Sequence, residues 1–159
     1  MMNLTRGLQA LARQVNVQTN IEQPAAALTL TRSTSLAIAT AGTTVIWQTE
    51  TRNNGFTWSG TDITIPASGY YSVQCFFLVS NNMTLQIQRV INGTIVGGFV
   101  VLQNLTTNYF PATMTRYFTA GDILAIRLIP STASFITVAV EGAISEAPIL
   151  HIIQLSASV

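Results

Sequence analysis

The sequence predicts an all-β protein, a sandwich or barrel of short antiparallel strands behind a short N-terminal α-helical arm. Three observations lead to this prediction. From residue 25 onward, short runs of β-branched and aromatic residues recur, with turn residues between them. No apolar spacing typical of a helix separates these runs, so strands do not alternate with helices. The length of 159 residues suits one domain with its own hydrophobic core.

The N-terminal arm and its linker occupy residues 1–24, and the β domain occupies residues 25–159. Four aliphatic side chains follow one another at intervals of four, three and four residues, which predicts an amphipathic helix over residues 4–17: Leu4, Leu8, Leu11 and Val15. Asn3 is a suitable N-cap. The apolar seam is about two heptads long, too short to be stable alone in water. It must pack on its own domain, on sister copies or on another protein, and we expect it to dock on a larger assembly.

The strands of the domain are predicted from β-branched and aromatic runs bounded by turn residues. Asn92-Gly93 lies between two such runs and predicts a hairpin, and Asn53-Asn54-Gly55 predicts another turn. Strands at this spacing, with no helices between them, form a sandwich or barrel. The predicted strands are 26–32, 36–40, 44–51, 62–66, 70–80, 83–91, 94–103, 108–118, 123–130, 135–141 and 149–156.

Three of these strands carry apolar side chains on both faces, namely those over 70–79, 123–129 and 149–155. A sandwich strand buries only one face in its own core. The second face therefore needs a cover, and a large exposed apolar patch marks an interaction site. Loops or the N-terminal helix are one possible cover. We expect the other possibility, contact between copies of the chain.

The charge content excludes several classes of partner. Only 8% of residues are charged, the net charge is +1, and there are seven arginines and no lysine. No basic patch is present for nucleic acid. A sparsely charged surface tends to associate, and protein interfaces favour arginine over lysine. Codon bias is the alternative reason for the missing lysines. No apolar run is long enough to span a membrane, and the N-terminus does not read as a signal peptide.

Residues that carry chemistry are scarce. His151 is the one histidine and lies in an apolar strand, where a structural role is expected. Cys75 is the one cysteine and lies in an apolar run, so we expect a buried thiol. The acidic residues are scattered, with no paired-carboxylate or metal-ligand spacing. We therefore predict no catalysis, no metal and no cofactor. Five aromatic residues could stack on a sugar but more often fill cores or subunit seams: Trp47, Trp58, Tyr109, Phe110 and Tyr117.

Three motifs carry a family resemblance. The run Ile63-Thr64-Ile65-Pro66-Ala67-Ser68-Gly69-Tyr70-Tyr71-Ser72-Val73, the turn Thr119-Ala120-Gly121-Asp122-Ile123-Leu124-Ala125-Ile126 and the ending Ile149-Leu150-His151-Ile152-Ile153-Gln154-Leu155 resemble those of tumour-necrosis-factor and complement-globular-head domains. The resemblance covers roughly residues 45–157 and implies an antiparallel jelly-roll β-sandwich. The chain departs from vertebrate members in lacking a signal peptide, a collagen stalk and their cysteines, which argues against secreted signalling.

The resemblance also implies an assembly. Members of this superfamily usually form compact homotrimers whose threefold axis is lined by aromatic and aliphatic side chains. We expect part of the following set to line such an axis: Tyr70, Phe76, Leu78, Leu124, Ile126 and Leu128. Alternation leaves open which side of each strand faces the core.

Similar domains occur on bacteriophage virions as capsid decoration (cement) proteins and as fibre tips. The leading hypothesis is a trimeric decoration protein, made in the host cytoplasm, that binds the major capsid protein and stabilises the head by mass action. The alternative is a fibre or spike tip that recognises a host surface sugar or protein. A carbohydrate-active enzyme is disfavoured by the scattered acids. Copy number on the virion discriminates the first two, since decoration implies hundreds of copies per particle.

Overall fold

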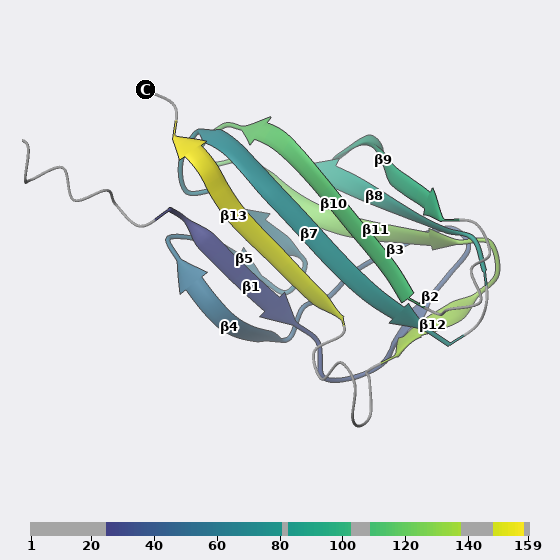
Figure 1. Ribbon diagram of the computed structural model, residues 1–159. Helices are drawn as coiled ribbons and strands as arrows, with labels where there is room; N and C mark the ends of the chain where they lie inside the picture. Colours follow the sequence, from purple (N-terminus) through teal and green to yellow (C-terminus); the bar gives the residue numbers. More distant parts are fainter. Residues whose placement is uncertain (1–24, 81–82, 103–108, 138–147, 158–159) are drawn as a thin grey trace, which may run out of the picture.

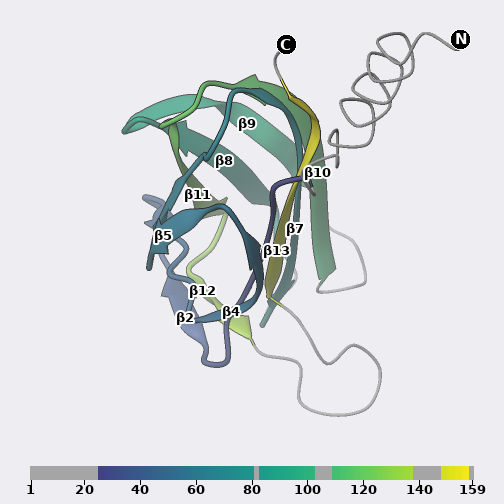
Figure 2. The ribbon, with the colours of Figure 1, turned by 90° about the vertical axis from the view of Figure 1, so that its left-hand side faces the viewer.

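Two antiparallel sheets face each other in the computed structural model, which describes residues 25–80, 83–102, 109–137 and 148–157 (Figures 1 and 2). One sheet has seven strands, in the order β2 (Leu36–Ile38), β12 (Ser134–Thr137), β7 (Gly69–Val79), β13 (Ile149–Ala157), β1 (Ala27–Thr31) and β4 (Thr49–Asn54), with β10 (Tyr109–Phe118) paired to β7. The other has six strands, in the order β5 (Thr57–Ser59), β6 (Asp62–Thr64), β11 (Ile123–Pro130), β8 (Leu85–Ile91) and β9 (Thr94–Leu102), with β3 (Thr43–Thr44) paired to β11. The predicted all-β sandwich is confirmed.

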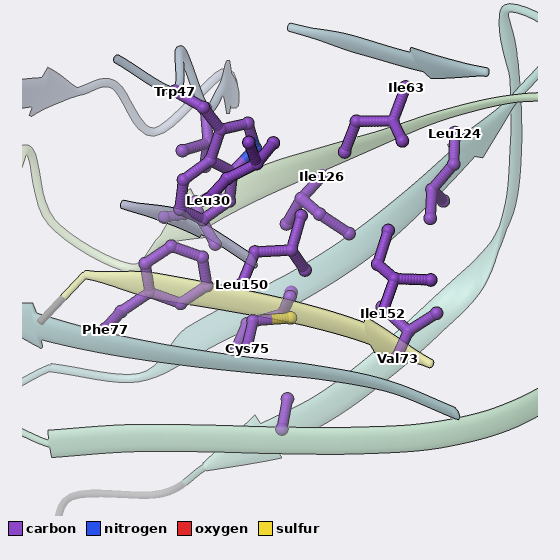
Figure 3. Close-up of a cluster of buried hydrophobic side chains, with 14 of the residues drawn as sticks. Leu30, Trp47, Ile63, Val73, Cys75, Phe77, Leu124, Ile126, Leu150 and Ile152 are labelled. Atoms are coloured by element: carbon purple, nitrogen blue, oxygen red, sulfur yellow. The ribbon is translucent and has the colours of Figure 1, made fainter. Parts of the chain in front are cut away.

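The core lies between the two sheets and is built by alternation along each strand. On β7, Val73, Cys75 and Phe77 point inward, toward Leu124 and Ile126 on β11 (Figure 3). All five side chains are buried. Full burial of an aliphatic or aromatic side chain contributes about 1.5–3 kcal/mol, so this layer is a main source of stability.

The segment predicted as one strand over 44–51 is instead a crossing between the sheets. Thr44 pairs with β11 in the six-stranded sheet, whereas Thr49 pairs with β1 in the seven-stranded sheet. Between them, Val45 and Trp47 are buried, and the Trp47 amide donates to the Gly60 carbonyl at 3.0 Å. Strands that change sheet in this way make the corners of a sandwich. The sequence showed the alternation but not the change of partner.

The Pro66–Tyr71 motif prepares the start of β7. The Tyr71 ring is buried, and its hydroxyl donates to the Ala67 carbonyl at 2.7 Å. Gly69 packs against β13, because a Cβ at this position would lie 2.2 Å from the Ser156 carbonyl oxygen. The glycine therefore lets the two strands approach at the point where β7 begins.

The predicted turns are confirmed at two places. Asn92 and Gly93 connect β8 to β9 with φ values of 50° and 76°, the positive values that a two-residue hairpin turn requires. Asp122 closes the turn before β11: its Oδ2 accepts from the Thr119 amide at 2.9 Å, and its Oδ1 accepts from Asn92 Nδ2 at 2.9 Å. The side chain of Asp122 therefore joins two turns and has a structural role.

The predicted helix over 4–17, with Leu4, Leu8, Leu11 and Val15, lies outside the described residues. The ranges that the structure does describe contain strands and turns, and none of their segments is a helix with the length and hydropathy needed to cross a bilayer.

Candidate assembly interface

The outer face of the seven-stranded sheet is centred on β7. Side chains on this strand alternate between buried and accessible, and those pointing outward are Tyr70, Ser72, Gln74, Phe76 and Leu78. Tyr70 is 52% exposed, and Phe76 and Leu78 are half-buried. Because β7 is flanked by β10 and β13, its outer side chains form the middle of a wider surface (Figure 1).

The neighbouring strands extend this surface with further apolar groups. Pro111 on β10 and Ile149 on β13 stand beside Phe76 in register, one on each side. Tyr117 on β10 stands beside Tyr70, with ring centroids 5.4 Å apart in an edge-to-face arrangement. Such an aromatic pair is usually worth about 0.5–1.5 kcal/mol beyond its buried area. The pair gives this end of the face a fixed shape.

Exposed hydrophobic side chains concentrate on this sheet. Among the described residues, eight large hydrophobic side chains are exposed, and five of them belong to its strands: Tyr70, Tyr117, Phe135, Ile153 and Leu155. Scattered exposed hydrophobics need no explanation, but a contiguous group marks a contact surface. We call the outward-facing side chains of β1, β7, β10 and β13 the outer face.

A shallow hollow lies in the middle of the outer face. Its volume is about 370 Å³, and it is lined by Gln74, Cys75, Phe76, Pro111, Ala112, Thr113, Ile149 and His151. His151 is half-buried, and its Nδ1 lies 3.0 Å from the Thr29 hydroxyl oxygen on β1. The structural role expected for this histidine is thus supported by a defined hydrogen-bond partner.

The outer face is also devoid of acidic and arginine side chains. The outward positions of β7, β10 and β13 carry hydroxyl, amide, imidazole and apolar groups only. When such a surface is buried against a partner, no charge is desolvated without a counter-ion. The large free-energy penalty of an unpaired buried charge is therefore avoided.

The six side chains predicted to line a trimer axis fall into two groups. Tyr70, Phe76 and Leu78 do lie on the outer face, on β7. The prediction is wrong for the other three, since Leu124, Ile126 and Leu128 are 0% exposed and point into the chain's own core. On β11 it is the opposite side chains that face outward, among them Ile123, which is 41% exposed.

Three contributors to the outer face were missing from the predicted set of axis residues: Tyr117, Ile153 and Leu155. The two-sided apolar pattern of 149–155 was a signal for Ile153 and Leu155. Tyr117 was named only among the aromatic residues that could stack on a sugar or fill a core or subunit seam, because it joins the face through the pairing of β10 with β7.

Side chains that could carry chemistry have structural roles at two described positions, Glu50 and Cys75. Glu50 accepts from Trp58 Nε1 at 2.6 Å and from Asn53 Nδ2 at 2.8 Å. Burial raises the pKa of the Cys75 thiol to about 12, which makes it a poor nucleophile at neutral pH. No group of three or more potential metal ligands occurs within the part of the chain that the structure describes.

No family model matches the sequence, and no curated protein matches it. Solved structures do match. Murine APRIL, in a crystal structure at pH 8.5, is similar with a TM-score of 0.55 and 17% sequence identity, over 82% of this chain and 99% of that chain. Eiger TNF from S. frugiperda is similar with a TM-score of 0.58 and 16% identity, over 85% of this chain and 95% of that chain. The predicted TNF-like jelly-roll fold is confirmed by these matches, which at such identity concern the fold alone.

Proposed function

We propose that this chain is a non-enzymatic structural protein that forms a homotrimer through the outer face and decorates a bacteriophage capsid by binding its major capsid protein. The observation that carries the proposal is the outer face itself: it exposes several large apolar groups, carries no acidic or arginine side chains, and is centred on the longest described strand. The described side chains that could have carried chemistry are buried or bonded to neighbours.

A second copy is the occupant that best suits this face. Its lack of acidic and arginine side chains offers nothing to attract a charged partner, whereas identical copies need only matching apolar shapes. Cyclic assemblies close by placing one patch of each copy on a different patch of the next. The resemblance to tumour-necrosis-factor domains implies three copies around an axis lined by aromatic and aliphatic groups. Tyr70 and Phe76 on β7 supply groups of that kind.

The decoration role is supported by the surface that would remain exposed on the trimer. The whole chain has only 8% charged residues and no lysine, so the remaining surface is also inclined to associate. Binding that occurs only to the assembled shell stabilises the shell by mass action, without any chemical step. The arm over residues 1–24 is the segment we expect to reach the major capsid protein.

The trimer is tested by Phe76→Asp. Phe76 is half-buried in the single chain, so the variant should fold, while its charge would be unpaired in a desolvated contact. We expect light scattering to show a trimer for the wild type and a monomer for the variant, with association weakened roughly a hundredfold or more. The matched control is Ile95→Asp on β9, because Ile95 is 47% exposed on the other sheet. A wild-type chain that stays monomeric at micromolar concentration contradicts the trimer.

The decoration role is tested with the same proteins and undecorated capsid shells. Wild type and Ile95→Asp should co-sediment with shells, at a copy number in the hundreds for each particle. Phe76→Asp should bind weakly, since a single arm lacks the effective concentration that three linked arms provide. A copy number of a few tens or fewer on purified virions would instead indicate the fibre or spike tip.

A further inference from the structure

His151 holds a central place on the outer face. It lies on β13 between two register partners, Gln74 on β7 and Thr29 on β1. It also lines the hollow, together with Phe76 and Ile149. A side chain in this place is half-buried in one copy and would lose its remaining water in a trimer that covers the face. Its protonation state therefore bears directly on the proposed contact.

The neutral imidazole is well accommodated. The Thr29 hydroxyl lies 3.0 Å from Nδ1 and can donate to it or accept from it, so either neutral tautomer keeps this hydrogen bond. Protonation makes both ring nitrogens donors. Thr29 can then accept a hydrogen bond from Nδ1 only, so the charged ring would need a further acceptor for Nε2.

Within the described part of the chain, no counter-ion faces the imidazole in the sheet register or the hollow. Its polar register partners are Gln74 on β7 and Thr29 on β1, Thr113 on β10 lines the same hollow, and all three are neutral. The nearest charged position in the sheet register is Arg52 on β4, which stands opposite Thr29 and is itself a cation. Tyr70 and Tyr117 are the titratable groups toward one end of the face.

From this arrangement we propose that His151 makes the trimer sensitive to acid: the assembly forms at neutral pH and dissociates into folded monomers near pH 5. The inference rests on the proposed trimer. Histidine is the side chain whose charge changes between about pH 5 and 8. In a covered face, each protonated ring is a desolvated charge without a partner, and three such charges lie in one assembly.

The direction follows from linkage. Protons bind the separated chains more tightly than the trimer, so lowering the pH favours the separated chains. Up to three protons are released when a trimer forms, one from each His151. The association constant should therefore fall by up to about a thousandfold for each pH unit in the acidic range.

The experiment measures the oligomeric state of the full chain by light scattering between about pH 7.5 and 5, at constant ionic strength. Wild type should change reversibly from trimer to monomer, with circular dichroism showing an intact sheet throughout. His151→Gln keeps a group that can bond Thr29 but cannot become charged, so its oligomeric state should not change between the two ends of the range. A wild type that is trimeric throughout, or a variant that dissociates like the wild type, overturns the inference.

A second measurement does not depend on any variant. The association constant of the wild type, obtained by dilution at several pH values, gives the number of protons released on assembly from its slope. A slope near zero overturns the inference but leaves the trimer in place. A wild type that is monomeric at every pH overturns the proposed function itself, so the two failures are distinguishable.

Discussion

Cys75 illustrates how one position on β7 sets the reactivity of a side chain. Its thiol is 3% exposed on the core side, and burial raises its pKa from 9.0 to about 12. The thiolate is the reactive form, so at about pH 8 the native protein should resist a maleimide that labels the unfolded protein within minutes. Mass spectrometry after a timed reaction measures this difference.

The same thiol affects stability in alkali. Because the pKa is higher in the folded protein than in the unfolded chain, the stabilisation is complete below pH 9 and is lost as the pH rises toward 12. Cys75→Ala removes this contribution, so its unfolding free energy should fall less steeply over that range than the wild type's. In the maleimide experiment, labelling of the native protein as fast as that of the unfolded chain would show that the thiol is accessible.

At the residue scale, the sequence predicts which side chains alternate but not which side they take. Of the residues predicted to line a trimer axis, Tyr70 and Phe76 point outward, whereas Leu124 and Ile126 point into the core. On a strand with apolar groups on both faces, the pattern is symmetric, and only the partner sheet decides which face is buried.

At the element scale, a single glycine in a short motif allows two strands, β7 and β13, to approach each other closely. Gly69 begins β7, and a Cβ there would lie 2.2 Å from the Ser156 carbonyl oxygen of β13. Gly69→Ala should therefore force the strands apart and lower the unfolding free energy by about 2–3 kcal/mol. Thermal and urea unfolding measure this loss.

Gly121 provides the matched control. Its φ is +87°, and nothing lies within 4 Å of the position of an added Cβ. Gly121→Ala should cost only the backbone strain of a left-handed residue, about 1 kcal/mol. Equal losses in the two variants would mean that the contact between β7 and β13 does not explain the glycine.

At the element scale, prediction succeeded where local signals suffice. The Asn92-Gly93 hairpin and the long central strand needed only turn residues and alternation. The segment 44–51 failed because its hydrogen bonds run to two different sheets. β5, over Thr57–Ser59, was missed because three residues give too short a pattern to recognise.

The whole molecule is predicted to separate into a stable domain and a docking arm. A chain beginning at Ala25 should fold and form trimers, because it keeps every described member of the core cluster, from Leu28 to Ile152. It should lose most of its binding to undecorated shells. Burying four aliphatic side chains contributes on the order of 6–12 kcal/mol, and ordering about a dozen residues offsets most of that. A single arm would therefore bind a shell weakly, and the three arms of one trimer are needed for tight binding.

Sedimentation of the truncated chain with shells measures that binding, and the full chain is the control. Undiminished binding would show that the arm is not the anchor. Failure to fold would show that the helix predicted from Leu4, Leu8, Leu11 and Val15 belongs to the domain core. At this scale the sequence could predict the fold through its motifs, but the outer face required the pairing of β7 with β10 and β13.

β7 is hydrogen-bonded along both edges, to β10 on one side and mainly to β13 on the other. Its inner side chains are buried in the core, and its outer ones belong to the proposed trimer contact. An amide hydrogen of this strand can reach bulk solvent only when a neighbouring strand opens. In a trimer, that opening first requires a subunit to leave. The rate of deuterium uptake along β7 is then set by the lifetime of the assembly rather than by the domain alone.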